Sequence, residues 1–151
     1  MNKCFGQKHV GNGKYGHDAD KDQSGWTAFC EALKDNKNIQ TLVLSDIGIG
    51  PVGLTTLAKL IPDSAALTEI RLDGQPITGS KYGSGHKQHG VEEYDRDPSG
   101  FVALLEAMKS SAVAKLSISD CDIGPKGLMT SAPLISVIPA LKEITLDGQP
   151  I

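Results

Sequence analysis

The sequence predicts an α/β fold in which short parallel strands alternate with helices along an elongated array. The first observation is a duplication: SDIGIGPVGL begins at Ser45 and returns as SDCDIGPKGL at Ser119. The string LDGQPI occurs at 72–77 and, with the same offset, at 146–151, while SGWTAFCEAL at Ser24 returns as SGFVALLEAM at Ser99. Self-similarity at a fixed period indicates an array whose units bury their apolar faces against one another.

The second observation is a shorter period inside each duplicated module. Four segments read apolar-x-x-apolar-x-apolar, and they begin at Ile39, Leu67, Val113 and Leu141. The first and last steps each equal one 28-residue unit, and the middle step is one such unit plus an 18-residue insertion. Two-residue alternation is typical of a strand with one buried face. We expect strands centred on 41–45, 69–73, 115–119 and 143–147, with buried Leu42, Leu44, Ile70, Leu72, Leu116, Ile118, Ile144 and Leu146.

The third observation is a helical pattern between the strands, with apolar residues at i, i+3, i+4 and i+7. The three sets are Trp26, Phe29, Cys30 and Leu33; Leu54, Leu57, Ala58 and Ile61; and Phe101, Leu104, Leu105 and Met108. Ser24 and Ser99 stand where an N-cap is expected, and Pro51 and Pro125 stand near a first helical position. The fourth helix is expected to be interrupted by Pro133.

Over residues 24–151 the pattern resembles the leucine-rich repeat, L-x-x-L-x-L-x-x-N/C-x-L. The 28-residue length and the IGP-x-GL string are similar to those of the ribonuclease-inhibitor-like subclass. Cys121 occupies the Asn/Cys position, whereas Ile47, Gln75 and Gln149 depart from it. The resemblance implies a right-handed solenoid with a parallel β-sheet on its concave face and helices on its convex face. It also implies an interaction scaffold, because most members of the family serve as one.

We divide the chain into four parts. These are a partial preceding repeat and loop (1–23), module one (24–77), an inserted Gly/His-rich loop (78–98) and module two (99–151), with two repeats in each module. Residues 5–16 align without gaps on 72–83 and share Lys-Tyr-Gly. The chain is therefore expected to open inside a repeat, and either to stack end to end or to form part of a larger array.

Composition excludes several classes of function. A net charge of −3 disfavours a nucleic-acid partner, which would require a basic stripe. No apolar run approaches the roughly 20 residues of a membrane span, and the first residues carry no signal-type segment. The three cysteines are an odd number, and Cys30 and Cys121 occupy apolar pattern positions. We therefore expect an intracellular, cytoplasmic protein.

An acidic motif occurs twice, just before the helices that open each module. D-x-D-x-S-G followed by Glu fits a calcium-binding loop, since calcium prefers six to eight oxygen ligands. The candidate ligands are Asp20, Asp22, Ser24, Glu31, Asp95, Asp97, Ser99 and Glu106. No entering helix is predicted upstream of either copy, so capping of the following helix by the serine and the acids is the favoured interpretation. A calcium-responsive binding module remains the alternative.

No motif predicts an active site. His86 and His89 could ligate a transition metal together with Glu92 or Glu93, but a solvated loop is the favoured interpretation. Phosphate-loop, nucleophile-elbow, zinc-protease and CxxC motifs are all missing from the sequence. GTPase activation is suggested only by the related Ran GTPase-activating proteins, and no catalytic residue can be assigned to it. We expect a non-enzyme without a cofactor.

The candidate binding site is the row of side chains that alternates with the buried strand positions. Such residues point away from the core and form rows across neighbouring strands, on the face where repeat solenoids bind protein partners. They are Thr41, Val43, Ser45, Asp46, Glu69, Arg71, Asp73, Lys115, Ser117, Ser119, Asp120, Glu143, Thr145 and Asp147. The acidic and small side chains fit a basic or polar protein segment, and a merely solvated polar face is the equal alternative.

Overall fold

Four helices and six short strands make up the described part of the chain. The computed structural model describes residue 20, residues 22–83 and residues 90–148. The main elements are α1 (Ser24–Lys34), β1 (Thr41–Val43), α2 (Pro51–Leu60), β2 (Glu69–Arg71), α3 (Ser99–Met108), β5 (Lys115–Ser117), α4 (Pro125–Ile135) and β6 (Glu143–Thr145). A 3-10 turn, η1 (Ile61–Asp63), follows α2, and β3 (Lys81–Tyr82) and β4 (Val91–Glu93) lie between β2 and α3. The fold is α/β, as predicted.

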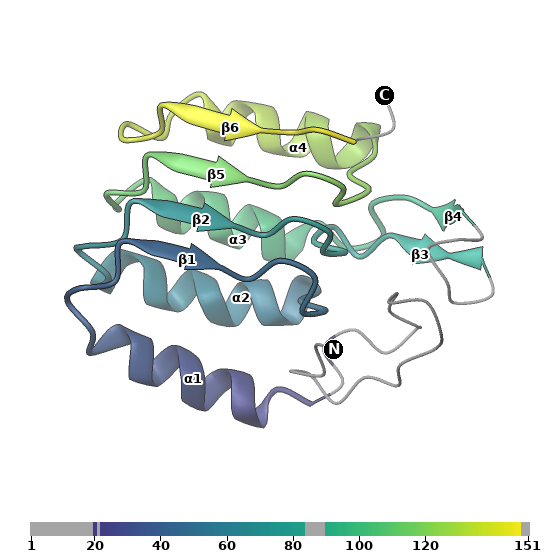
Figure 1. Ribbon diagram of the computed structural model, residues 1–151. Coiled ribbons are helices and arrows are strands. Elements are labelled where there is room, and N and C mark those ends of the chain that lie inside the picture. Colours follow the sequence, from purple (N-terminus) through teal and green to yellow (C-terminus); the bar gives the residue numbers. More distant parts are fainter. Residues whose placement is uncertain (1–19, 21, 84–89, 149–151) are drawn as a thin grey trace.

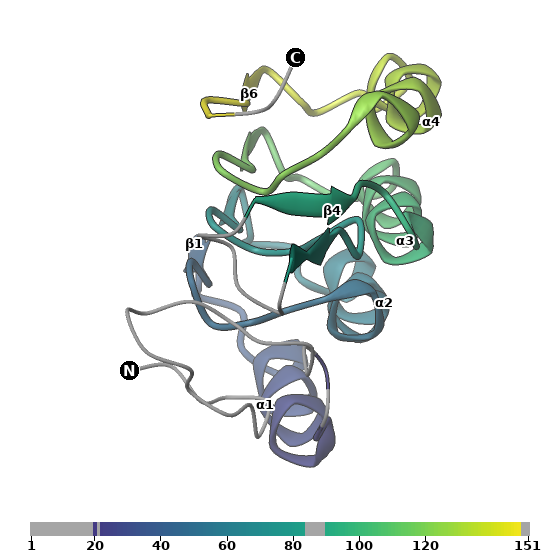
Figure 2. The ribbon, with the colours of Figure 1, turned by 90° about the vertical axis from the view of Figure 1, so that its right-hand side faces the viewer.

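The central sheet has the order β1-β2-β5-β6, and every pair in it is parallel. Each of its strands follows one helix in the sequence, and all four helices lie behind the same face of the sheet (Figure 1). The view from the side shows the strands and the helices as two layers, with α1, α2, α3 and α4 stacked in chain order (Figure 2). In the described part of the chain the other face of the sheet carries no helix, and we call it the open sheet face.

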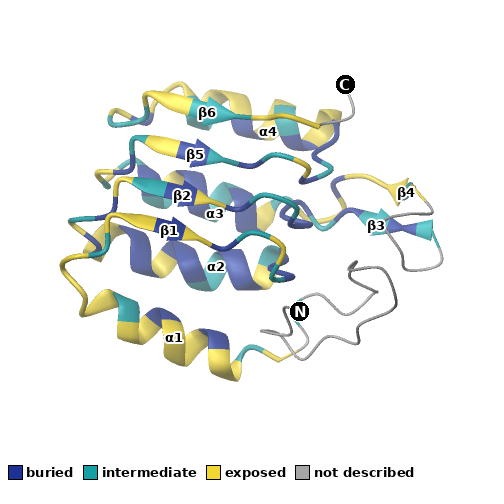
Figure 3. Cartoon of the chain, in the orientation of Figure 1, coloured by how far each residue is buried: buried dark blue, intermediate teal, exposed yellow. Residues whose placement is uncertain are grey.

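The core lies between the two layers, and the strands contribute to it with alternate residues. The inward residues Leu42, Leu44, Ile70, Leu72, Leu116 and Ile118 are buried, as predicted. At β6 the prediction is wrong, because Ile144 is only half-buried and Leu146 is exposed. Burial weakens toward this strand (Figure 3). β1 is also an edge strand, but its inward residues share the core with Trp26 and Cys30 of α1, whereas no described helix follows β6 to cover its apolar residues.

The helix starts match the prediction for the prolines but not for the serines. Pro51 and Pro125 occupy the first turn of α2 and α4, where a missing N–H costs nothing. Ser24 and Ser99 are the first residues of α1 and α3 and do not cap them. A helix opened by Asp-x-Ser can use the carboxylate instead, since an Asp side chain readily accepts from the N–H two residues ahead.

Pro133 does not interrupt the fourth helix, contrary to the prediction. Helix α4 runs through Pro133 to Ile135. A proline inside a helix leaves the carbonyl four residues earlier without its helical donor. That carbonyl belongs to Met129, whose side chain is 78% exposed, so water can reach this turn of the helix. The small Ser131 is buried and donates to the Leu128 carbonyl at 3.1 Å.

The insertion contains a hairpin where a loop was predicted. β3 and β4 pair antiparallel, and Figure 1 shows them beside the carboxyl ends of the main strands. The base of the hairpin is anchored to module two, because Ser80 Oγ donates to the Asp122 carbonyl at 2.8 Å and Tyr82 Oη donates to Asp122 Oδ2 at 2.9 Å. His86 and His89 lie outside the described residues, as does nearly all of the predicted partial repeat 1–23.

Candidate partner-binding face

The strand register aligns the predicted binding residues in rows across the open sheet face. Thr41, Glu69, Lys115 and Glu143 are neighbours in one row, and Val43, Arg71, Ser117 and Thr145 are neighbours in the next. These rows are those expected from the 28-residue spacing. The rows form because each repeat contributes the same positions of the apolar pattern to its strand, so equivalent residues become neighbours. The binding role of these residues stays a prediction.

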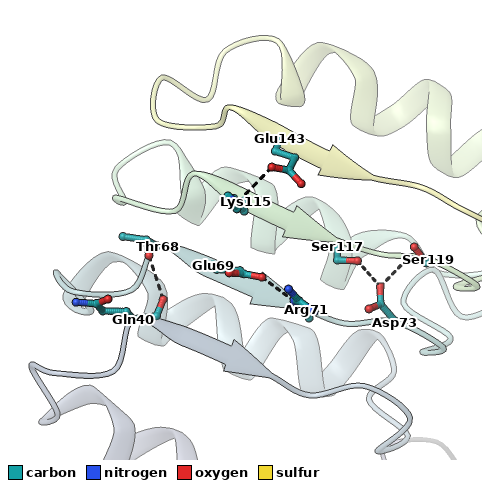
Figure 4. A network of polar contacts seen from close by, with 9 residues as sticks. All are labelled: Gln40, Thr68, Glu69, Arg71, Asp73, Lys115, Ser117, Ser119 and Glu143. Carbon is teal, nitrogen blue, oxygen red and sulfur yellow. Dashed lines mark hydrogen bonds and ion pairs between the residues drawn. The ribbon is translucent and has the colours of Figure 1, made fainter.

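The middle of this face carries two ion pairs (Figure 4). Arg71 Nε lies 2.6 Å from Glu69 Oε1 on β2, and Lys115 Nζ lies 3.4 Å from Glu143 Oε2 across β5 and β6. The hydrogen bond from Arg71 to Glu69, together with the charge of Glu69, raises the pKa of the Arg71 guanidinium. Exposed ion pairs stabilise a fold very little. These four side chains can therefore exchange their present partners for charges on another protein.

Asp73 has a structural role as well as a place on the face. Its Oδ1 accepts from Ser117 Oγ at 2.6 Å and from the Ser119 backbone N–H at 2.8 Å, so it ties the end of β2 to the end of β5 (Figure 4). Its equivalent in module two, Asp147, follows the edge strand and is exposed. One of the two aspartates is thus engaged within the sheet, while the other faces solvent at its edge.

Beyond the strands, the face continues in a row of alternating Asp and Gly. Asp46 and Asp120 adopt positive φ angles of 54° and 53°, which aspartate tolerates better than most residues. A Cβ on Gly74 would overlap the Asp46 carboxylate, and one on Gly148 would overlap that of Asp120. Glycine is thus required where each carboxylate crosses to the next repeat. The arrangement places a band of carboxylates along the carboxyl ends of the strands.

A shallow depression of about 210 Å³ lies over β2, β5 and β6 on the open sheet face. Its lining consists of Glu69, Arg71, Lys115, Leu116, Ser117, Glu143 and Thr145. Both ion pairs described above contribute to this lining, so the depression itself is balanced in charge. The additional acidic side chains, Asp46, Asp120 and Asp147, are exposed beyond the ends of the strands and do not line it. The face is therefore less uniformly acidic than the sequence suggested.

The two acidic motifs cap helices. Asp22 Oδ1 accepts from the Ser24 N–H at 3.0 Å, and Asp97 Oδ1 does the same for Ser99 at 3.0 Å. The hydrogen bonds from Ser24 lower the pKa of the Asp22 carboxyl. Capping of α1 and α3 was the favoured interpretation, and the structure assigns it to these aspartates in place of the serines.

The first aspartate of each motif caps the second helix after the motif, which is α2 for the first motif and α4 for the second. Asp20 accepts from the N–H groups of Gly50, Val52 and Gly53 at 2.9–3.0 Å, at the start of α2. Asp95, its counterpart in the second motif, likewise accepts from N–H groups at the start of α4 and is only 1% exposed. Negative charge at a helix N-terminus satisfies N–H groups that have no partner within the helix.

Asp95 is this counterpart, and it accounts for the glycines of the repeated IGP-x-G string. It accepts from the Gly124 N–H at 2.9 Å and from the Gly127 N–H at 2.7 Å. A Cβ on Gly124 would come within 2.7 Å of the Asp95 carboxylate, and one on Gly127 would come within 2.6 Å. The glycines therefore make room for a buried acid that belongs to a distant part of the sequence.

The calcium alternative loses its ligands to these caps. The oxygens of Asp20 and Asp95 point into helix N-termini, and Glu31 and Glu106 are exposed helix residues. Glu106 instead pairs with Lys109 at 2.7 Å. Among residues 20, 22–83 and 90–148, no group of three or more His, Cys, Asp or Glu could hold a metal ion. The geometry thus disfavours a calcium loop.

The unequal burial of the two caps gives a testable difference. Replacing Asp95 by Ala should cost about 2–3 kcal/mol of unfolding free energy, because two N–H donors lose a charged acceptor in a buried site. Replacing Asp20 by Ala should cost only about 1–2 kcal/mol, since the N–H groups around this half-buried side chain can turn to water. Urea denaturation of both variants measures the two costs. Equal losses would contradict the roles assigned here.

Sequence reasoning missed Gln75, which is completely buried in the turn after β2. Its Oε1 accepts from the Gly48 and Ile49 N–H groups, each at 2.8 Å, and its Nε2 donates to the Leu44 carbonyl. The departure from the Asn/Cys pattern at this position is therefore compensated by a longer amide that reaches back to the previous repeat. The signal was present in the repeated LDGQPI string, where Gln recurs as Gln149, outside the described residues.

The cysteines of the described residues are structural. Cys30 and Cys121 are both buried thiols, and burial raises the pKa of the Cys30 thiol to about 11. Thiolates are the nucleophilic form, so Cys30 is unreactive near neutral pH. Cys121 Sγ donates to the Leu72 carbonyl at 3.2 Å, which links the two modules at the Asn/Cys position.

None of the helices in the described part of the chain is long and apolar enough to cross a membrane.

Comparison with known proteins shows the fold. No family model matches the chain, and no curated protein matches it. Among solved structures, 34 chains match. One of them is titled "Leiomodin-1 Actin-Binding Site 2 (ABS2)"; it superposes with a TM-score of 0.64 at 17% sequence identity, over 100% of this chain and 69% of that one. At this identity the two chains share an arrangement of helices and strands.

Proposed function

We propose that the chain is a non-catalytic leucine-rich repeat module that binds a partner protein on its open sheet face. The two nested periods of the sequence, the in-register parallel strands and the single layer of helices support a right-handed solenoid with this face as its concave side. The observation that carries the binding role is the depression over β2, β5 and β6 with its exchangeable ion pairs.

The geometry favours an extended, basic segment as the partner. Each row holds one side chain from every strand, so a chain lying across the strands meets the side chains of a row one after another, at the spacing of the strands. Asp46, Asp120 and Asp147 provide exposed carboxylates beyond the ends of the strands, and Glu69 and Glu143 can exchange their present cations for a partner's arginine or lysine. Charge complementarity of this kind guides association and selects the partner.

Two further features guide the choice of compartment and of a first partner to test. The thiols of Cys30 and Cys121 are buried, and buried thiols outside disulfides suit a reducing compartment such as the cytoplasm. The similar structure carries an actin-binding site in its title, so actin is one purified protein to test as a partner.

The test compares two double variants that change the net charge equally. Glu69→Lys with Glu143→Lys reverses two charges in the depression, and Glu31→Lys with Glu106→Lys reverses two exposed charges on the helices. Binding of labelled Arg/Lys-rich and Asp/Glu-rich peptides, and of actin, is followed by fluorescence anisotropy at several salt concentrations. We expect the first pair to weaken binding of the basic peptide or of actin by about tenfold or more, and the helix pair to leave it nearly unchanged.

Two outcomes would contradict the proposal. If both double variants weaken binding equally, only the net charge of the chain matters and the open sheet face is no site. If the native chain binds neither peptide nor actin, a basic extended segment is not its partner. Circular dichroism of each variant confirms that the fold is retained before binding is measured.

A further inference from the structure

The interface between the two modules shows how repeats of this chain fit together. α2 and β2 of module one pack against α3 and β5 of module two. Backbone bonds join the strands, from the Leu72 N–H to the Ser117 carbonyl at 2.8 Å and from the Gly74 N–H to the Ser119 carbonyl at 2.8 Å. The interface is thus formed by one helix and one strand from each side.

The duplication places the same two surfaces at the two ends of the stack. α1 and β1 are the counterparts of α3 and β5, and α4 and β6 are the counterparts of α2 and β2. The α1–β1 end therefore repeats the surface that module two uses, and the α4–β6 end repeats the surface that module one uses. Within the described residues both strands are edges of the sheet, and no described strand pairs with their outer backbone groups.

Glycine marks the close approach between helices in this interface. At Gly100, in the first turn of α3, a Cβ would overlap the backbone carbonyl of Pro51 in α2. Gly25 holds the same position in α1, and no atom of the described residues beyond its own helix lies within 4 Å of where its Cβ would stand. The counterpart of Pro51 is Pro125, which is exposed in the first turn of α4. The two halves of this contact are thus present at opposite ends of the described residues, within which they do not meet.

Apolar side chains that are buried between the two modules have more exposed counterparts at the two ends. Leu104, on the face of α3 that carries Gly100, is completely buried, whereas its counterpart Phe29 is 45% exposed. Leu72 is completely buried, whereas its counterpart Leu146 is 37% exposed. Other counterparts lose burial in the same way: Leu54 and Leu128, Ile61 and Ile135, and Ile70 and Ile144. The residue types at these positions remain apolar at both ends.

We propose that the α4–β6 end of one copy docks on the α1–β1 end of a second copy and repeats the interface between the modules. The occupant is a second copy because the chain itself already contains this interface, with matching residues on both sides. In the stacked pair, Pro125 faces the partner's Gly25, and Leu146 and Gly148 donate backbone bonds to the partner's Val43 and the partner's Ser45. Asp147 takes the place of Asp73 and accepts from the partner's Ser45 N–H.

Docking through two different ends is a heterologous contact. Such contacts extend into open stacks unless the rotation between copies closes a ring. The strands of successive copies would continue one parallel sheet, and the open sheet face would become longer with each copy. This association does not depend on the partner proposed for that face.

The test uses Gly25→Gln, with Glu31→Gln as its matched control. A Cβ at position 25 comes within 4 Å of no described atom outside its own helix, and glutamine has a higher helix propensity than glycine, so the variant should melt no lower than the native chain. In a stack the same side chain would clash with the first turn of the neighbouring α4. Glu31 carries an exposed side chain, and its counterpart Glu106 stays exposed beside the interface between modules, so glutamine there should change nothing.

Sedimentation velocity of the 151-residue chain, from about 1 μM to about 1 mM, measures the association. We expect the native chain and Glu31→Gln to gain mass with concentration, and Gly25→Gln to associate at least about tenfold more weakly. A native chain that stays monomeric throughout the range would overturn the proposal and leave the two ends to other occupants. Association of Gly25→Gln at the native level would overturn the assigned interface.

Discussion

Replacing Gln75 by leucine should cost roughly 3–5 kcal/mol of unfolding free energy, since a hydrogen-bond partner removed from a buried polar group costs about 1–3 kcal/mol each time. The side chain makes three such bonds, to the N–H groups of Gly48 and Ile49 and to the carbonyl of Leu44. It is completely buried, so water cannot replace the amide without opening the turn. Leucine has a similar volume, and the loss therefore reports on the polar contacts and not on a cavity.

Gln40→Leu is the matched control for this measurement. Gln40 has an exposed side chain just before β1, and the same substitution there should change the unfolding free energy by less than about 0.5 kcal/mol. Guanidinium denaturation of the native chain and both variants gives the two differences. A loss below about 1 kcal/mol for Gln75→Leu would mean that the turn after β1 is held by other contacts, and the role assigned to Gln75 would be wrong.

The second large effect is expected at Leu72, which has an identical counterpart in the duplicated LDGQPI string. Leu72→Ala should cost about 3–5 kcal/mol, because it leaves a cavity between the sheet and the helices at a position with no exposure. Leu146→Ala should cost less than about 1.5 kcal/mol, since this side chain at the edge of the sheet is 37% exposed in the single chain. The local sequence is the same at both sites, so the difference isolates tertiary burial.

Chemical denaturation at low protein concentration compares the two leucine variants under conditions that favour the single chain. Equal losses would show that β6 is covered as well as β2 and would contradict the burial described here. At high concentration, the proposed stacking should increase the cost of Leu146→Ala, because docking on β1 of a second copy buries this residue. The cost of Leu72→Ala should not depend on concentration.

The strands, their order and their register could be predicted because they follow from local periods in the sequence. Leu-x-Leu alternation indicates a half-buried strand, and a repeat of fixed length places successive strands side by side in the same register. The pairing of Thr41 with Glu69 follows from the 28-residue step, and that of Glu69 with Lys115 follows from the return of the same apolar pattern after the 18-residue insertion. The same reasoning located the prolines that open α2 and α4.

The polar contacts of the site could not be predicted, because they join residues that are distant in the sequence. Asp95 caps α4, which begins only at Pro125, and Gln75 bonds the turn at Gly48 and Ile49 in the previous repeat. The D-x-D-x-S-G spacing favoured caps but also fitted a calcium loop, and it did not show which helix each aspartate would cap. The packing of α1 against α2 and of α3 against α4 decides where each carboxylate points. It brings the loop before α1 to the start of α2, and the loop before α3 to the start of α4.

Some features of this protein therefore follow from its sequence alone, and others depend on its tertiary packing. The duplication and the recurring apolar patterns were sufficient for the α/β class and for the rows of candidate binding residues, because these features repeat over short stretches of chain. The helices on one face of a parallel sheet were implied by the resemblance that the same patterns carry. Packing decided which aspartates cap helices, that β3 and β4 pair antiparallel, and that Ile144 and Leu146 stay uncovered while Ile70 and Leu72 are buried. Identical strings in the two modules cannot distinguish these outcomes, since burial depends on which element lies on the other side.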